Sequence, residues 1–437
     1  MVKPLSRSAA RMRVRGHGAG VTRRLAGPGA AMTRTQPIWL DLDCRGNMRG
    51  AFALDAAALA QRSGQNLGNL VFRRALENAV DLDDAVAMDY SVASRVSPDR
   101  RPSHLVVSAA NWLADDAIAE RDNDYRRRLF ESFDCPVVVF GLGAQCALDT
   151  RPTLGPKTRD LIRLLGERSR SISVRDTLTA ELIHDAGVPH AVVTGCPSSL
   201  LNLDPALGAT LQRRAGALDT LDYAEMRVHV TETSGGHARS ADAMHAGLAI
   251  LRDSPSFMVV QEPELLPFLL RETPRLPAAY AEHAQALGCS GRELEILLRQ
   301  RTLFFSSVDG WMDFARTCDL SIGMRLHGAM IALQAGVPAL LVTHDERTRG
   351  LGETMALPRL DPQSFVALQR QQLRGVGARV QEALEGYDAN RQRLARLMLD
   401  HARRNGLMAR PEFVDFCSAT ARPAETERRP PRLAVAA

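Results

Sequence analysis

Between residues 37 and 343 the sequence alternates ten short apolar runs with amphipathic, helix-like stretches. Strands that alternate with helices are typical of βαβ units, which build parallel sheets covered by helices. The alternation therefore predicts an α/β protein. The first five runs are residues 37–42, 105–108, 137–140, 171–174 and 191–194, and the second five are 227–231, 256–261, 303–306, 319–322 and 339–343.

The length of the chain predicts two domains, because 437 residues exceed what one hydrophobic core usually supports. We expect two Rossmann-like, doubly wound domains that face each other across a cleft, similar to two-domain GT-B glycosyltransferases, with a C-terminal helical segment. The expected division is a basic, disordered extension (1–36), an N-terminal domain (37–215), a C-terminal domain (216–360), C-terminal helices (361–420) and a flexible tail (421–437).

The net charge of +5 does not indicate a nucleic-acid partner. Residues 1–36 contain eight Lys and Arg and no Asp or Glu, and the rest of the chain contains 47 basic and 50 acidic residues. The aromatic content of 5% is also low for a surface that stacks bases. The basic segment lacks the apolar run of a signal peptide, so we favour a disordered extension or a true start at Met32.

The seven cysteines are scattered and form no CxxC pair, which argues against a disulfide framework or a zinc site. His229 and Glu232 resemble half of a metal site, but no further ligands follow at a suitable spacing. No apolar run approaches the roughly 20 residues of a membrane span. We expect a cytoplasmic protein without metal or cofactor, at most associated with the inner face of the membrane.

The segment 319–342 is the most informative, because Arg325 and His327 lie where a predicted strand ends and a predicted helix begins. Open α/β folds bind ligands and anions at this edge of the sheet. A guanidinium there can hold a carboxylate or phosphate, and an imidazole can move protons. The alternative is that Arg325 pairs with a structural carboxylate and His327 caps or packs.

A second segment, residues 171–199, has the same layout. Arg175 ends a predicted strand, and Asp176 is expected to cap the next helix or to pair with Arg175. Cys196 has no histidine in its own motif, so we interpret it as a packed thiol in a loop, with nucleophilic catalysis as the lesser alternative.

Several other residues are candidates for substrate binding. The turn Gly141-Leu-Gly-Ala-Gln145, with Gly143 at its centre, and the segment 64–69 could hold phosphate on backbone amides, although neither is a complete phosphate-binding motif. Glu232 is a candidate acid or ligand of a sugar hydroxyl, and Arg347 follows a predicted strand end. Trp311 could stack on a sugar, but we favour packing.

Ser173-Val-Arg-Asp176, Gly195-Cys-Pro197, Arg325-Leu-His327 and Gly336-Val-Pro338, with Asp345-Glu-Arg347 downstream, resemble the motifs of the polysaccharide pyruvyl transferase family over about residues 60–360. The resemblance implies transfer of a pyruvyl unit from phosphoenolpyruvate to two hydroxyls of one sugar. It also implies that Arg325 and His327 are catalytic and bind the donor, and that Arg175 assists from the facing domain. The chain departs from the family at residues 64–69, which lack an acidic residue, and at Arg347, where relatives often have Lys.

By this resemblance the partners are phosphoenolpyruvate and a glycan or lipid-linked saccharide of exopolysaccharide biosynthesis. Two alternatives remain open. One is a glycosyltransferase that uses a nucleotide sugar in the same kind of cleft, and the other is a sugar- or anion-binding protein without activity. Phosphate release, as opposed to nucleotide release, separates the first two.

Overall fold

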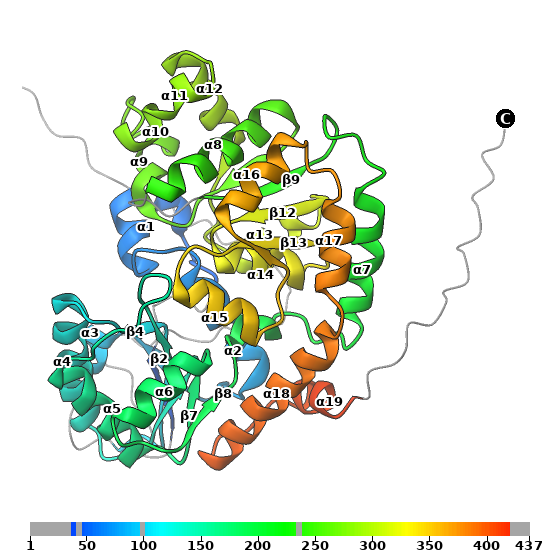
Figure 1. Ribbon diagram of the computed structural model, residues 1–437. Coiled ribbons are helices and arrows are strands. Elements are labelled where there is room, and N and C mark those ends of the chain that lie inside the picture. Colours follow the sequence, from blue (N-terminus) through cyan, green and yellow to red (C-terminus); the bar gives the residue numbers. More distant parts are fainter. Residues whose placement is uncertain (1–35, 41–45, 97–100, 233–237, 420–437) are drawn as a thin grey trace, which may run out of the picture.

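A computed structural model describes residues 36–40, 46–96, 101–232 and 238–419. The chain forms two α/β lobes, one around each of two parallel sheets (Figure 1). Two predictions lie outside the described residues: the extension, of which only residue 36 is described, and the tail at 421–437. No helix in the described ranges is long and apolar enough to cross a membrane.

The N-terminal sheet has the strand order β2-β1-β3-β5, and every pair of strands is parallel. Two parallel pairs, β4 with β6 and β7 with β8, extend this half, and a bridge from Leu142 to Val174 joins them. The strands are β1 (Ile38–Leu40), β2 (Val86–Met88), β3 (Leu105–Ser108), β4 (Asn111–Leu113), β5 (Val137–Phe140), β6 (Gly143–Ala144), β7 (Ile172–Val174) and β8 (Ala191–Val193).

Helices cover both faces of this sheet because successive side chains on a strand point to opposite faces. Ile38 and Leu105 pack on one face with residues of α4 and α5. Trp39 and Val106 pack on the other face with residues of α2 (Asn69–Ala79), α18 (Tyr387–Arg404) and α19 (Pro411–Ser418). The helices of this half are α3 (Tyr90–Ala93), α4 (Ala117–Glu131), α5 (Pro156–Arg168) and α6 (Thr177–Asp185), and a 3-10 turn, η2 (Pro197–Leu200), follows β8.

The C-terminal sheet is also parallel and has the order β11-β10-β9-β12-β13-β14. Its strands are β9 (Val228–Thr231), β10 (Phe257–Val259), β11 (Thr302–Leu303), β12 (Leu320–Gly323), β13 (Ala339–Val342) and β14 (Arg359–Leu360). Its helices and 3-10 turn are α7 (Leu207–Leu218), α8 (Ala238–Asp253), η3 (Pro263–Leu265), α9 (Leu266–Leu269), α10 (Ala278–Ala281), α11 (His283–Ala286), α12 (Gly291–Arg301), α13 (Val308–Ala315), α14 (Leu326–Gln334) and α15 (Glu346–Thr354).

Each of the ten predicted runs overlaps a strand, so the sequence pattern located the framework of both sheets. The pattern missed β2, β4, β6 and β14, which are only two or three residues long. Such short strands show no period of their own. The fold is nevertheless the predicted one, two Rossmann-like α/β halves with a helical C-terminal segment.

Early and late helices of the chain pack on the half of the molecule that lies beyond the domain boundary predicted near residue 215. The early elements η1 (Ala51–Ala53), α1 (Ala56–Arg62) and α2 (Asn69–Ala79) begin on the C-terminal half, where Leu59 and Phe72 join the core of the second sheet. Leu76, later in α2, packs on the first sheet, so α2 bridges both halves. The C-terminal helices are α16 (Pro362–Arg370), α17 (Val376–Ala383), α18 (Tyr387–Arg404) and α19 (Pro411–Ser418), and the last two return to the N-terminal lobe (Figure 1).

Candidate active site

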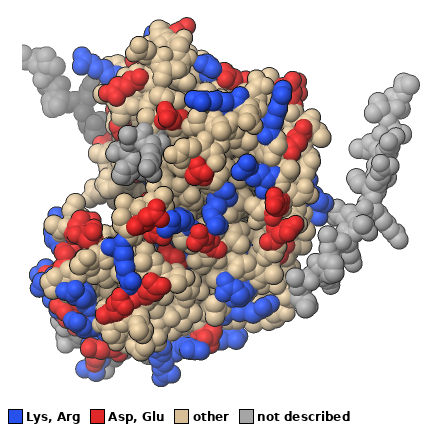
Figure 2. Space-filling view, in the orientation of Figure 1, with Lys and Arg blue, Asp and Glu red and all other residues tan. Residues whose placement is uncertain are grey.

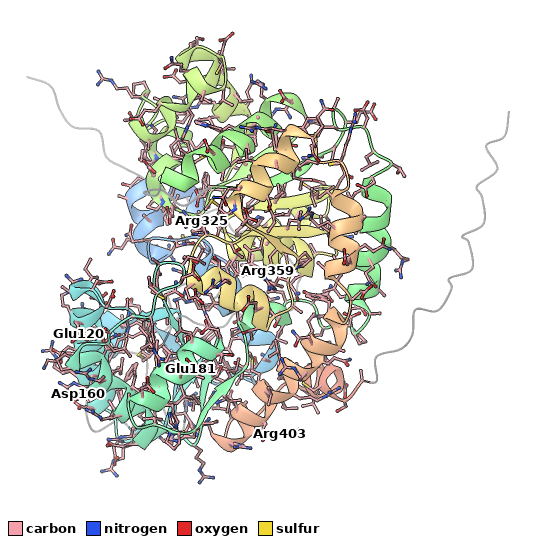
Figure 3. All side chains as sticks on the ribbon, viewed as in Figure 1. Glu120, Asp160, Glu181, Arg325, Arg359 and Arg403 are labelled. Atoms are coloured by element: carbon pink, nitrogen blue, oxygen red, sulfur yellow. The ribbon has the colours of Figure 1, made fainter. Side chains whose placement is uncertain are left out.

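The site lies where the carboxyl ends of the two sheets meet. The surface is indented between the lobes on the left of the view in Figure 2, and Arg325 lies in the upper lobe close to the level at which the lobes meet (Figure 3). Ligands of open parallel α/β folds bind at this edge.

The β12–α14 connection positions Arg325 and His327. β12 ends at Gly323, whose φ of +147° few other residues adopt, and a Cβ there would lie 2.2 Å from Thr231 Oγ1. Glycine thus allows the strand end to approach β9, and the Arg325 N–H donates to Thr231 Oγ1 at 3.1 Å. Arg325 is the N-cap residue of α14, and His327 lies in its first turn.

The Arg325 guanidinium is buried between two carboxylates of its own half. Its Nε lies 3.3 Å from Glu232 Oε1, and its Nη1 lies 2.6 Å from Glu262 Oε1. Its Nη2 is buried and has no hydrogen-bond partner among the described residues. Arg325 is therefore paired with carboxylates, the alternative that the sequence left open. It argues against Arg325 as the main cation for the donor, because its charge is already balanced.

Glu232 accepts hydrogen bonds from the backbone N–H groups of Gln261 and Glu262, both at 2.8 Å. Burial raises the pKa of Glu232 to about 7, although Arg325 and the two N–H groups act in the opposite direction. The carboxyl therefore changes its protonation state near neutral pH, as an acid or base of catalysis requires.

His327 lies between elements of both halves. Its Nε2 is 3.8 Å from Cys196 Sγ, and its ring centroid is 5.4 Å from that of Phe72 on α2. Burial, and then the guanidinium charges of Arg175, Arg347 and Arg73, lower the pKa of His327 well below its usual value. The imidazole is therefore neutral in the ligand-free site.

Arg175 follows β7 and is 1% exposed. Its Nη1 donates to Asn111 Oδ1 at 3.1 Å and its Nη2 to the Ala109 carbonyl at 3.2 Å, whereas its Nε has no partner among the described residues. Its guanidinium carbon lies 5.2 Å from the centre of the Phe72 ring. Neutral acceptors hold this cation, and no carboxylate forms an ion pair with it in the described ranges.

Arg73 and Arg347 complete the group of cations. Arg73 follows Phe72 on α2, and its guanidinium carbon lies 4.8 Å from the Phe72 ring centre. Arg347, in the first turn of α15, pairs with Asp345, with Nη2 and Oδ2 3.3 Å apart. The sequence singled out Arg347 but missed Arg73. Only its place on a helix that bridges the two halves brings Arg73 to the site.

The turn Gly141-Leu-Gly-Ala-Gln145 does not cradle phosphate, which corrects the sequence interpretation of Gly141, Gly143 and Gln145. Its five backbone amides all donate to protein acceptors, in order Ser173 Oγ, the Ser173 carbonyl, the Ala110 carbonyl, Thr179 Oγ1 and the Leu113 carbonyl. A Cβ at Gly143 would lie 3.0 Å from Arg175 Cδ. The glycines therefore leave room for Arg175, and the Gln145 side chain accepts from Asn111 at 3.0 Å.

Three further candidates, Cys196, His229 and Trp311, contact other side chains of the fold. Cys196 is fully buried, as interpreted, but it does contact a histidine, because the fold brings His327 to it from 131 residues away. His229 interacts through one ring nitrogen with Ser321 and through the other with the indole N–H of Trp311, so it has none left for a metal. Trp311 packs in the core. Within the described parts of the chain no cluster of His, Cys, Asp and Glu is arranged to hold a metal ion.

The family model described as polysaccharide pyruvyl transferase matches residues 66–346, which is most of the folded chain, includes Arg73, Arg175 and Arg325, and ends one residue before Arg347. The chain belongs to this family. As a polysaccharide pyruvyl transferase family member it is an enzyme of the transferase class, and its expected partner is a saccharide.

Several solved structures are similar to this chain at low identity. HepE from Anabaena, crystallised with UDP, is 11% identical with a TM-score of 0.38 over 83% of this chain and 99% of its own. The wall teichoic acid polymerase TagF is 12% identical with a TM-score of 0.33 over 73% and 78%. The trehalose 6-phosphate synthase from Burkholderia multivorans is 11% identical with a TM-score of 0.36 over 84% and 96%. A search of curated proteins found no match.

The segment 64–69, where this pyruvyl transferase departs from the family pattern, docks on the C-terminal half. The Leu67 N–H donates to the Gln261 carbonyl at 2.8 Å, and the Gly68 N–H donates to Asn66 Oδ1 at 2.8 Å. A Cβ at Gly68 would lie 2.2 Å from Gln261 Oε1 and 3.1 Å from His327 Nδ1. The loop thus lies close to the side chains of Gln261 and His327, and the Leu67 and Gly68 amides are engaged by protein.

Proposed function

We propose that the protein transfers a pyruvyl group from phosphoenolpyruvate to two hydroxyls of one sugar residue, which gives a cyclic pyruvate ketal and phosphate. The observation that supports this most is the set of guanidiniums around His327. Arg175 comes from the N-terminal sheet, Arg73 from the bridging helix α2, and Arg347 from the C-terminal half. A small acid with both a carboxylate and a phosphate needs such a set of cations.

In this proposal Arg175 binds the donor most directly. The Nε–H of Arg175 has no hydrogen-bond acceptor among the described residues, and a buried N–H group without an acceptor is costly. In this proposal an oxygen of phosphoenolpyruvate accepts this hydrogen bond. Phe72 contacts the guanidiniums of Arg73 and Arg175 and keeps them beside the imidazole. Arg325 contributes to the site by holding Glu232 and Glu262 and does not itself bind phosphoenolpyruvate.

The chemistry needs a proton at C3 of the enol phosphate while a sugar hydroxyl forms its bond to C2. Burial, and then the guanidinium charges, hold His327 neutral in the ligand-free site. The negative charge of phosphoenolpyruvate offsets those guanidinium charges, so its binding raises the pKa of His327 and favours uptake of a proton. His327 then delivers this proton to C3. The second hydroxyl displaces phosphate from C2, and its proton leaves with the phosphate or an adjacent base.

We also propose that the acceptor is a glycan or lipid-linked saccharide of exopolysaccharide synthesis, that no cofactor takes part besides the donor substrate, and that the reaction occurs in the cytoplasm or at the inner face of its membrane. Family membership supports the saccharide acceptor. The near balance of acidic and basic residues beyond residue 36 supports the absence of a nucleic-acid partner.

The test is incubation of the purified protein with phosphoenolpyruvate and a panel of free and lipid-linked glycans, with phosphate release and the mass of the product as readouts. We expect phosphate and ketal to form in equal amounts. His327→Gln should abolish both, and the matched control His184→Gln, at an exposed position on α6, should not. Nucleotide release from a nucleotide sugar, without turnover of phosphoenolpyruvate, would instead identify a glycosyltransferase.

A further inference from the structure

A second polar group lies beside the cations, at the carboxyl ends of three neighbouring strands. Glu232 follows β9, Gln261 and Glu262 follow β10, and Arg325 follows β12. Because β10, β9 and β12 are adjacent and parallel, their ends meet at one edge of the sheet. The salt bridges from Arg325 to both glutamates confirm that the side chains converge.

This group contains hydrogen-bond donors without acceptors. Arg325 Nη2 and Gln261 Nε2 are both buried and have no partner among the described residues, although the Arg325 side chain is only 8% exposed and Gln261 only 2%. They lie beside the carboxylates of Glu232 and Glu262, which are acceptors. A hydroxyl both donates and accepts, so a pair of sugar hydroxyls can satisfy donors and acceptors of this group together.

The group formed by Glu232, Gln261, Glu262 and Arg325 lies next to the imidazole of His327, beside which phosphoenolpyruvate is proposed to bind. Gln261 Oε1 and His327 Nδ1 would both contact a Cβ at Gly68, at 2.2 and 3.1 Å, and Gln261 Nε2 would lie 3.3 Å from a Cβ at Gly328 in the same turn of α14. Cys196 contacts the other ring nitrogen, Nε2. Gln261 therefore lies on the Nδ1 side of the imidazole and the Cys196 thiol on its Nε2 side.

This group carries a charge opposite in sign to that of the cations Arg73, Arg175 and Arg347. The two carboxyl groups of Glu232 and Glu262 outnumber the single guanidinium of Arg325. The Glu262 side chain is 40% exposed, so its carboxylate faces whatever enters from solvent. A carboxylate on an incoming sugar would meet repulsion here, whereas an uncharged sugar would not.

We propose that Glu232, Glu262, Arg325 and Gln261 form the acceptor subsite and that this subsite selects a sugar residue without negative charge. Glu232 accepts the proton of the attacking hydroxyl, and Arg325 positions the two carboxylates. The proposal rests on the proposed function, because the sugar must present its hydroxyls to a donor held beside His327.

Binding can be measured without the donor, by saturation-transfer NMR and calorimetry on the full chain. The probes are the methyl glycosides of glucose, galactose and mannose and the corresponding methyl glycosides of their uronic acids. We expect at least one neutral glycoside to bind at least about tenfold more tightly than its uronate. Glu262→Gln should reduce this ratio to less than about threefold.

Glu131→Gln is the matched control, because Glu131 on α4 is 44% exposed and pairs with Arg127 at 2.6 Å, much as Glu262 pairs with Arg325. It should leave the ratio unchanged. Equal or tighter binding of the uronates, a ratio that Glu262→Gln does not alter, or no binding by any glycoside would each overturn the proposal.

The outcome is separable from that of the proposed function. Selective binding of a neutral glycoside without phosphate release from phosphoenolpyruvate would sink the donor assignment and leave the acceptor subsite in place. Turnover of phosphoenolpyruvate at equal rates with neutral and uronate acceptors would overturn the selectivity of the acceptor subsite and leave the donor assignment in place.

Discussion

Arg175 and Arg325 follow strands of the two sheets in nearly the same local setting, yet their surroundings differ. After each strand an arginine precedes a helix at the carboxyl edge of a parallel sheet. Arg175 is held by the neutral oxygens of Asn111 and Ala109 and has one donor unused. Arg325 is held between the carboxylates of Glu232 and Glu262.

The position of an arginine at a sheet edge therefore does not decide whether its charge is available to a ligand. A guanidinium with neutral partners keeps its positive charge for a ligand, whereas one between two carboxylates serves mainly to hold them. We therefore propose that Arg175 binds the anion and that Arg325 positions the acceptor subsite. The following predictions test that division.

The largest effect is expected for Arg175→Gln, which removes one positive charge and the unpaired Nε–H group from the cations around His327. We expect kcat/KM for phosphoenolpyruvate to fall by about a thousandfold, or about 4 kcal/mol of transition-state stabilisation. Steady-state phosphate release measures it. Circular dichroism checks that the variant folds, since Arg175 is buried.

Arg325→Lys is the paired comparison, because lysine keeps a cation between the two glutamates. We expect kcat/KM for phosphoenolpyruvate to change by less than about tenfold, while KM for the acceptor rises. If this variant loses as much toward phosphoenolpyruvate as Arg175→Gln, then Arg325 is the main ligand of the donor and the division is wrong.

A somewhat smaller effect concerns stability. Arg325→Ala leaves Glu232 buried without its partner and should lower the free energy of unfolding by about 3 kcal/mol. Urea unfolding measures the loss. Replacing Glu262 by Gln in the same chain should recover part of it, because one of the two unpaired carboxylates is then neutral. An unchanged midpoint in Arg325→Ala would mean that the salt bridges contribute little.

The smallest expected change is in pH dependence. Because burial raises the pKa of Glu232 to about 7, the carboxyl is protonated below this pH and ionised above it. If it accepts the proton of the hydroxyl, kcat/KM for the acceptor should rise with pH through about 7 and then level off. The residual activity of Glu232→Gln should lack this rise. By contrast, kcat/KM for phosphoenolpyruvate reports the free enzyme and should show no limb from His327 near pH 7, because the pKa of the ligand-free imidazole is well below its usual value.

Much of the framework could be predicted from the sequence, because local patterns set it. The apolar runs marked the ten main strands, and Asp176 was expected to cap α6, where its carboxylate accepts from the Thr179 N–H at 2.8 Å. The strand ends also placed Arg175, Arg325 and His327 at sheet edges. These features depend on residues close together in the chain.

The partners of those side chains could not be predicted in the same way. Glu262 meets Arg325 from 63 positions away, and Cys196 meets His327 from 131. Arg73 reaches the site only because α2 packs on both halves. The turn 141–145 resembled a phosphate loop, but its amides are engaged by residues whose positions depend on the strand order.

Local sequence patterns specify two parallel-sheet halves with basic and imidazole side chains at the strand ends, because hydrophobic period and turn residues act over short stretches of chain. Which arginine keeps an unbalanced charge and which is neutralised depends on the folded arrangement. Charges interact through space over a few ångströms, so the availability of each arginine depends on which distant carboxylates the fold brings within that range.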